Sequence, residues 1–285
     1  MAIDKNLKTT IIISVYKNTQ SLEIVLDSLN NQTIKPYEII ISEDGNSKQM
    51  KEFVSSLTYT NIIHLTQEDN GWQKAVALNN SIRKSKGEYL IFIDGDVVPH
   101  KRFVEGHLSC ANKKQVCCGK RSELGEGITQ KIYNHELKIN QLTSSYIRKI
   151  STLHKDGIRH YEEGIYISPN NIVHKLFLKD RHVKYIIGCN FSCYKEDMEA
   201  INGFDEDYKY PAIGEDVDLG WRFRGLGIEL KSCRNIANVY HLWHKKNFGS
   251  EAGEINNKIL EKNFAQNRYI CLNGLKKLND NEEQK

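Results

Sequence analysis

The sequence predicts an α/β protein with a mostly parallel central sheet flanked by helices and a helical extension at the C-terminus. Two observations lead to this prediction. Short apolar, β-branched segments recur through residues 10–99, and segments with apolar residues at helical spacing separate them. Acidic turns follow two of the strand-like segments, and parallel α/β sheets bind their ligands at the carboxyl ends of strands.

The first half of the chain reads as alternating strands and helices. Buried strands are predicted at 10–15, 38–42, 61–65 and 89–94. The first helix should begin with Thr19 or Ser21 as its cap and stop near Pro36. Because proline is tolerated in the first turn of a helix, another helix is expected from Pro99 to about Cys110.

The second half is less regular. Residues 120–184 contain glycine-rich turns, a helix-like stretch at 131–150 and a polar, histidine-rich part, and long excursions of this kind are usually functional lids or loops. Further elements are predicted as a strand at 185–194, helices at 195–201 and 215–225, a strand at 236–242 and a helix at 253–278. Acids open the helix at 215–225 and arginines close it, in agreement with the helix dipole.

Composition favours a soluble globular protein: 39% of the 285 residues are hydrophobic and 27% are charged. The N-terminus lacks the apolar core of a signal peptide, so a cytoplasmic protein is expected. The formal charge of +4 is dispersed and gives no reason to expect nucleic acid. Basic stretches at 175–184 and 245–246 are interpreted as solvated, although they could face anionic lipid or phosphate. The seven cysteines contain no C-x-x-C pair, and we expect them to be reduced and structural.

Asp94 and Asp96 flank Gly95 directly after the fourth strand. In extended backbone, side chains two residues apart project to the same side, and glycine lets the chain turn without a side chain in the way. Such a pair suits a hard divalent cation, which takes oxygen ligands. The alternative is a loop with two solvated acids, because a D-x-D pattern alone is weak evidence.

Four motifs, in this order of elements, resemble the family 2 glycosyltransferases, which have the GT-A fold. They are Ile-Ile-Ile-Ser-Val-Tyr-Lys-Asn-Thr at 11–19, Ile-Ile-Ser-Glu-Asp-Gly-Asn-Ser at 40–47, Phe-Ile-Asp-Gly-Asp at 92–96, and Asn-Gly-Phe-Asp-Glu at 202–206 followed by Gly-Glu-Asp-Val-Asp-Leu-Gly-Trp-Arg at 214–222. Residues 188–224 are also similar to the galactosyltransferase and N-acetylgalactosaminyltransferase part of bacterial chondroitin and hyaluronan polymerases. The resemblance covers residues 10 to about 244 and implies a Rossmann-like GT-A domain.

The resemblance implies a set of donor-binding residues. They are Tyr16, Glu43, Asp44, Lys74, Asn79, Asp94, Gly95 and Asp96. Tyr16 and an acid of the second-strand turn would hold the base and ribose, and a carboxylate would accept the N–H of uracil. This turn departs from the family's usual Asp-Asp-Gly-Ser, so the choice between Glu43 and Asp44 stays open. Lys74 would meet phosphate.

The resemblance also implies a metal site and a base. Asp96 would bind Mn2+ or Mg2+ bridging the diphosphate, with Asp94 nearer the ribose or a metal-bound water, and His241 or His244 as a further ligand. An imidazole ligand favours Mn2+ over Mg2+. Asp216, with Glu215 beside it, would be the general base that deprotonates the acceptor hydroxyl. The alternative for these two acids is that they only cap the helix that follows.

The function implied is a metal-dependent, inverting transfer of a hexose or N-acetylhexosamine from a UDP-sugar to a hydroxyl of a cell-surface glycan or lipid-linked acceptor. Two alternatives are an inactive protein that binds glycans or nucleotide sugars, and a sugar-nucleotide nucleotidyltransferase. Peripheral attachment to the inner face of the membrane is compatible with this function. The domain would span 1–250, divided into a nucleotide-binding half (1–119), an acceptor-side insertion (120–184) and a catalytic half (185–250), before a C-terminal helix and tail (251–285).

Overall fold

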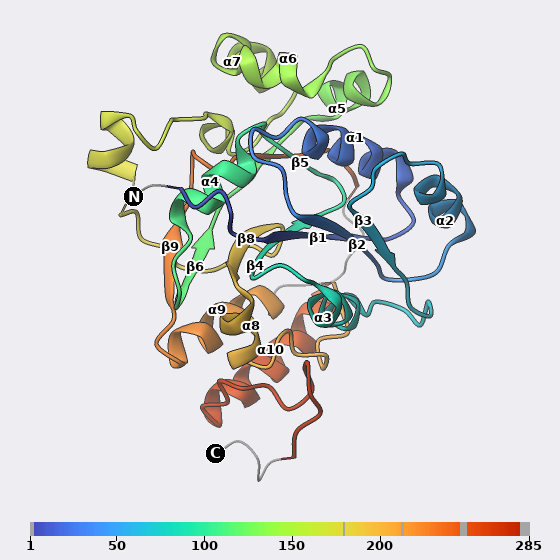
Figure 1. Cartoon of the computed structure of the whole chain (residues 1–285), viewed down its shortest axis with the longest axis vertical. Coiled ribbons are helices and arrows are strands. Elements are labelled where there is room, and N and C mark those ends of the chain that lie inside the picture. Colours follow the sequence, from blue (N-terminus) through green and yellow to red (C-terminus); the bar gives the residue numbers. More distant parts are fainter. Residues whose placement is uncertain (1–2, 179, 212–213, 246–249, 280–285) are drawn as a thin grey trace.

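The computed structural model describes residues 3–178, 180–211, 214–245 and 250–279. Its centre is a seven-stranded sheet (Figure 1). In spatial order the strands are β3 (Ile62–Leu65), β2 (Glu38–Glu43), β1 (Thr9–Val15), β4 (Tyr89–Asp94), β8 (Asn190–Tyr194), β6 (Gln115–Cys118) and β9 (Glu229–Ser232). β8 runs antiparallel to both neighbours, and the other pairs are parallel. The predicted mostly parallel sheet is therefore confirmed, while β6 and β9 were not predicted.

Helices cover both faces of this sheet, because each buried strand carries apolar side chains on both sides. Ile11 and Ile13 of β1 face one apolar cluster, and Ile12 faces the other. The helices of the first face are α1 (Thr19–Asn30), α2 (Lys48–Ser55) and α4 (Phe103–Cys110). Those of the second face are α3 (Lys74–Lys84), α8 (Lys195–Ala200) and α9 (Glu215–Gly225) (Figure 1). The cap of α1 is Asn18, whose side chain accepts the N–H of Ser21, so the predicted caps were wrong.

A second, three-stranded sheet joins distant parts of the chain. Its strands are β5 (Val97–Pro99), β10 (Val239–His241) and β7 (Ser122–Glu123). Pro99 pairs with Val239 in this sheet, and α4 begins only at Phe103. The helix predicted to start at Pro99 therefore starts later, because a strand pairing over a long sequence separation holds the proline in extended backbone.

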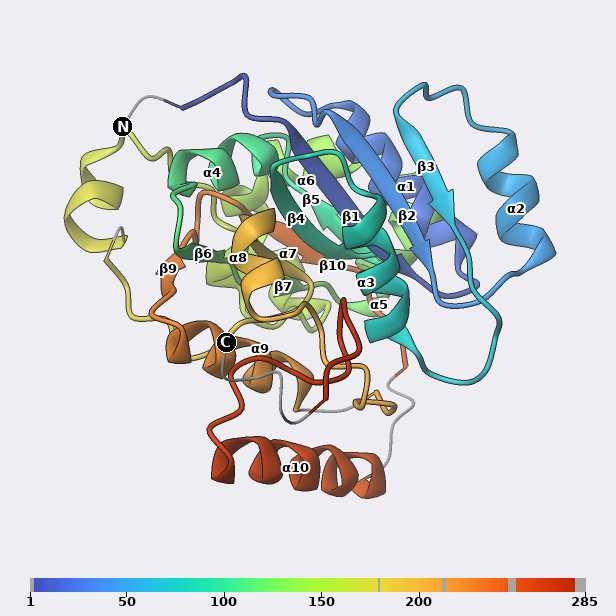
Figure 2. The same cartoon turned by 60° about the horizontal axis from the view of Figure 1, so that its bottom comes forward.

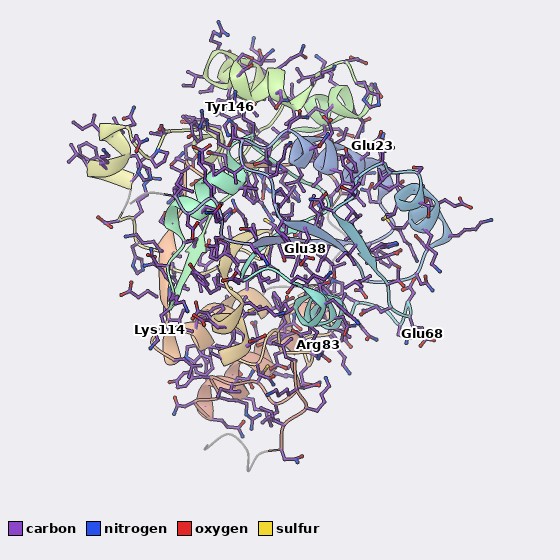
Figure 3. All side chains as sticks on the ribbon, in the orientation of Figure 1. Glu23, Glu38, Glu68, Arg83, Lys114 and Tyr146 are labelled. Carbon is purple, nitrogen blue, oxygen red and sulfur yellow. The ribbon has the colours of Figure 1, made fainter. Side chains whose placement is uncertain are left out.

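The insertion after β7 forms several short helices instead of one. They are α5 (Glu126–Tyr133), α6 (Ile139–Ser144), α7 (Tyr146–Lys155), the single turn η1 (Tyr161–Gly164) and the π-helical turn η2 (His174–Leu178). His135 has a φ of 58°, which ends the first helix of the expected stretch at 131–150. The hydroxyl of Tyr146, a residue labelled in Figure 3, is hydrogen-bonded to Ser122 Oγ at 2.9 Å. This bond connects α7 to β7.

The C-terminal helix α10 (Ser250–Ala265) lies beside α9 at one end of the molecule (Figure 2). It ends at Ala265, thirteen residues before the predicted end at 278. Two residues later, Asn267 takes a φ of 51°. The chain then folds back onto α3, and Arg83 donates hydrogen bonds to the carbonyls of Gly274 and Leu275 (Figure 3). Of the helices described, none is both long enough and apolar enough to cross a membrane.

Candidate active site

The Asp94-Gly95-Asp96 turn lies at the carboxyl end of β4, tight against β1. The Gly95 N–H donates a 2.8 Å hydrogen bond to the carbonyl of Ser14, and a Cβ at Gly95 would lie 2.7 Å from Val15 Cγ1. The glycine is therefore required by close approach of the two strands. The two carboxylates that flank it have different neighbours, so the structure does not bring them together as one paired ligand.

Asp96 belongs to a cluster with His241 and His244. Its Oδ2 lies 3.5 Å from His241 Nε2 and 3.3 Å from His244 Nε2, and one ligand atom from each residue falls within 4.8 Å of the others. Pairing of β10 with β5 sets this arrangement, because His241 is in register with Val97 and the Leu242 N–H donates to the carbonyl of Asp96. Burial acts to raise the pKa of Asp96, but the hydrogen bond with His241 and the electrostatic interactions with His241, His244 and Lys74 hold it below its ordinary value.

Asp94 forms an ion pair with Lys74 at the first residue of α3, with 2.7 Å between Oδ1 and Nζ. Burial would lower the pKa of Lys74, but the charges of Asp94 and Glu215 raise it above its ordinary value. Lys74 therefore stays protonated and is the cation shared by the acids of the site. The structure gives Lys74 a carboxylate as its partner, and contact between Lys74 and a phosphate stays a prediction.

Glu215 and Asp216 begin α9 after Gly214, whose φ of 145° favours glycine. Oδ2 of Asp216 accepts a 2.9 Å hydrogen bond from the Gly188 N–H, in the loop that leads into β8. Burial raises the pKa of Glu215 to about 7 and also raises the pKa of Asp216, which the Gly188 hydrogen bond and the charge of Lys74 partly oppose. Both acids therefore hold protons more tightly than solvated carboxyls do.

Arg121 is a further cation of the site that the sequence analysis missed. It lies between β6 and β7, with Nη1 3.5 Å from the Cys189 thiol and its guanidinium paired to Glu123. Its charge acts to lower the pKa of Asp216. A single arginine between two short unpredicted strands has no sequence pattern that would identify it.

Tyr16 follows β1, at the same edge of the sheet as Asp94 and Asp96. Its ring is half exposed and lies 3.7 Å from the position that a Cβ on Gly45 would take. Lys17 Nζ is 2.8 Å from Asp69 Oδ2 and 2.7 Å from the Tyr16 hydroxyl. An exposed aromatic face at the carboxyl end of β1 is available for stacking against a planar ring.

Both acids of the second-strand turn are already bonded within the protein. Glu43 accepts from the Ser47 N–H at the start of α2 and lies 2.9 Å from His64 Nε2. Asp44 accepts from Gln67 and from the Gln73 N–H, and burial raises its pKa. The two acids shape adjacent loops at this edge of the sheet.

Asn79 is buried on α3 and its side chain is occupied by the protein. Its amide donates to the carbonyl of Phe204 and to Glu206, and its oxygen accepts the Phe204 N–H. It fixes the turn at 202–206 to α3, so the structure places the Asn79 side chain in the core rather than in an open donor site.

Two family profiles match the chain. The profile described as glycosyl transferase family 2 matches residues 10–186, and the one described as the N-terminal domain of galactosyltransferase matches residues 171–245. Their overlap falls in the insertion, and together they include each acid and histidine of the site.

Named relatives of the chain are polysaccharide synthases. Chondroitin synthase of Pasteurella multocida is 24% identical over 79% of this chain and 24% of its own length. Chondroitin synthase of Escherichia coli is 25% identical over 81% of this chain and 34% of its length, and hyaluronan synthase of P. multocida is 24% identical over 81% and 24%. The chain thus spans about a quarter to a third of the length of these relatives.

A solved structure with a similar fold is a mannosyltransferase from Pyrobaculum calidifontis in complex with GDP-Man and Mn2+. The TM-score is 0.54 at 15% identity, and the match covers 87% of this chain and 61% of that one. This similarity confirms the predicted GT-A fold.

Proposed function

Because the chain belongs to glycosyl transferase family 2, we propose that this glycosyltransferase moves a hexose or N-acetylhexosamine from a UDP-sugar to an acceptor hydroxyl with inversion, and that it depends on a divalent cation. The observation that carries the proposal is the cluster of Asp96, His241 and His244 at the carboxyl end of β4. Ligands of parallel α/β sheets bind at this edge.

The donor set of this cluster fits a transition metal. One carboxylate oxygen and two imidazole nitrogens lie within 4.8 Å of each other, and imidazole ligands favour Mn2+ over Mg2+. Bound there, the ion would neutralise the charge that develops on a departing nucleotide diphosphate. The similar mannosyltransferase structure, which holds GDP-Man and Mn2+, supports a metal and a nucleotide sugar for this chain as well.

Asp216 is the base that we propose for the acceptor hydroxyl. One of its oxygens accepts the Gly188 N–H, which fixes the carboxyl and leaves the other oxygen to take a proton. Burial and the charge of Asp94 raise the pKa of Asp216, which makes its carboxylate a stronger base than a solvated one. Asp216 therefore gains basicity without losing its orientation.

The remaining residues orient the donor. Lys74, which is protonated and held by Asp94, is suited to a phosphate oxygen at the start of α3. Tyr16 offers an aromatic face for a nucleotide base, and Asp44 is bonded to the residue before Tyr16, because its N–H donates to the carbonyl of Val15. We therefore favour Asp44 over Glu43 for the base, and a uracil N–H would be its partner.

The direct test is release of UDP from a panel of UDP-sugars, with and without Mn2+ and with saccharide acceptors. We expect turnover that needs both metal and acceptor, and loss of turnover in Asp96→Ala and Asp216→Ala. Lys84→Met, on the exposed end of α3, is the control. Tight binding of UDP-sugar with no turnover on any acceptor would favour the inactive binding protein, and full activity of Asp216→Ala would exclude the assigned base.

A further inference from the structure

The insertion carries an exposed apolar segment that no described part of the chain covers. Ile172, Val173, Leu176 and Phe177 expose 69%, 45%, 68% and 72% of their surface. They lie on and just before the turn η2, the yellow coil that stands clear of the sheet at the left edge of Figures 1 and 2. Four large apolar side chains in six consecutive positions are far more than the scattered exposure that is normal on a soluble surface.

Basic side chains surround this segment. Of the residues that the structure describes between 172 and 184, which leave out 179, three are Lys or Arg and one is an acid, Asp180. Directly after η2, the chain lines a hollow of about 460 Å³ to which Arg181, His182, Arg224 and Lys231 contribute. The Arg224 guanidinium also donates to the carbonyls of Val183 and Lys184, which fixes the chain at the rim of the hollow. Asp180 and Glu229 also line the hollow, and Lys231 is paired with Asp180, so Arg181 and Arg224 make this rim basic beside the apolar tip.

We propose that residues 172–184 dock the enzyme on a membrane that carries anionic lipids. The apolar tip enters the boundary between headgroups and acyl chains, and the basic rim contacts lipid phosphates. The charge pattern selects this partner: an apolar protein interface has few charged residues at its centre, whereas Lys175 lies within the tip itself. Neutral bilayers satisfy only the apolar part and should bind more weakly.

This inference goes beyond the proposed transfer reaction and uses different residues. The docking segment joins the catalytic loop directly, since Gly188 follows Lys184 by four positions and holds Asp216.

The test is flotation of the full chain with lipid vesicles. Vesicles of phosphatidylcholine alone are compared with vesicles of equal parts phosphatidylcholine and phosphatidylglycerol. We expect binding to the mixed vesicles, weaker binding to the neutral ones, and release by high salt. The variant Ile172→Ser/Leu176→Ser/Phe177→Ser should lower the bound fraction about tenfold or more, because three large apolar groups no longer leave water.

Matched variants separate the contribution of the apolar tip from that of the basic rim. Ile147→Ser on α7 removes a side chain that is 67% exposed outside the segment and should bind like the wild type. Lys175→Glu/Lys184→Glu should lose binding to anionic vesicles and keep binding to neutral ones. Circular dichroism of each variant should match the wild type, because the altered side chains are exposed.

Two results would overturn the proposal. One is equal binding of the Ile172→Ser/Leu176→Ser/Phe177→Ser protein and the wild type to mixed vesicles. The other is absence of wild-type binding together with self-association in analytical ultracentrifugation that this variant abolishes, which would make the segment a contact between copies of the chain. Turnover of a soluble acceptor is measured in parallel, so a failed transfer reaction and a failed membrane contact are distinguishable.

Discussion

The backbone N–H of Gly188 donates a 2.9 Å hydrogen bond to Oδ2 of Asp216. Both carboxyl oxygens of Asp216 lie close to Gly188, because a Cβ at Gly188 would be 2.6 Å from Asp216 Oδ1. Real Cβ atoms do not approach an oxygen so closely, so any larger residue must move the carboxyl. The loop before β8 and the start of α9 are therefore fitted to each other at the proposed base.

Gly188→Ala is predicted to displace the Asp216 carboxyl and lower kcat by about 10²-fold, since small misplacements of a catalytic group have effects of that size. The KM for the donor should change little, because the substituted residue touches the acid and not the proposed donor residues. Steady-state kinetics with a UDP-sugar and acceptor measures both constants.

Gly253→Ala provides the matched control, because a Cβ at Gly253 on α10 meets nothing within 4 Å. It should leave kcat unchanged. If Gly188→Ala also keeps the wild-type kcat while its thermal stability is intact, Asp216 does not act through the orientation that Gly188 imposes.

The two histidines of the proposed metal site should not be equivalent. His241 is fixed in β10 and its side chain is 15% exposed, whereas the His244 side chain is 48% exposed and follows the strand. His241→Ala should raise the Mn2+ concentration needed for half-maximal activity by about tenfold or more, and His244→Ala should raise it less. Titration calorimetry of Mn2+ into each protein with UDP present checks this.

Removal of metal gives the companion experiment. Chelation by EDTA should abolish turnover. Added Mn2+ should restore it better than Mg2+, because imidazole ligands favour Mn2+. Asp96→Asn should resist restoration at any concentration used for the wild type. Full activity of the wild type in EDTA, with no detectable binding of Mn2+ to it, would contradict the metal assignment.

The sequence alone predicts the parts of this site that depend on local pattern. The strand before Asp94 is apolar throughout, and Asp94, Gly95 and Asp96 follow it at the ligand-binding edge in the structure, as predicted. The separate partners of the two acids were not predictable, because Lys74 reaches Asp94 from a helix whose packing depends on the whole sheet.

Long-range pairing explains most of what sequence reasoning missed. β6 and β9 are short: β6 becomes a strand because it pairs with both β8 and β9, and β9 because it pairs with β6. β10 lies within the predicted strand at 236–242, but β5 and β7, which pair with it where His241 reaches Asp96, have no strong local pattern. Arg121 was missed for the same reason, since its place beside Cys189 depends on the turn between two such strands.

Lys74→Met should move the pH dependence of the reaction. The charge of Lys74 acts to lower the pKa of Asp216, and a base works in its ionised form, so loss of the cation raises that pKa. The acid limb of the kcat/KM profile should therefore shift to higher pH, and kcat/KM should fall by about tenfold or more as phosphate stabilisation is lost. Rates measured across the pH range give the profile.

Lys74→Arg keeps the positive charge and should keep the position of the acid limb even if its rate is lower. Lys84→Met, at the other end of α3, should change neither. An unshifted limb in Lys74→Met would mean that Asp216 is not the group whose ionisation the profile reports.

Glu215 makes the fold sensitive to pH. Burial raises its pKa to about 7 from an ordinary 4.5, so between those values the folded protein keeps a proton that the unfolded chain has released. The stability that this group contributes is therefore lost as the pH rises through that window, and the loss is complete above it. Burial also raises the pKa of other acids, such as Asp205. These acids are present in both the wild type and Glu215→Gln, so they do not contribute to the difference between the two proteins.

Glu215→Gln keeps the shape of the protonated acid and cannot ionise. Its free energy of unfolding should equal that of the wild type at the acid end of the window and exceed it above neutral pH, by up to about 3 kcal/mol. Urea unfolding across the pH range measures the difference, with Glu254→Gln on the exposed side of α10 as the control that should follow the wild type throughout. Parallel stability curves for wild type and Glu215→Gln would show that the pKa of Glu215 is the same in the folded and unfolded chain, which would contradict its rise on burial.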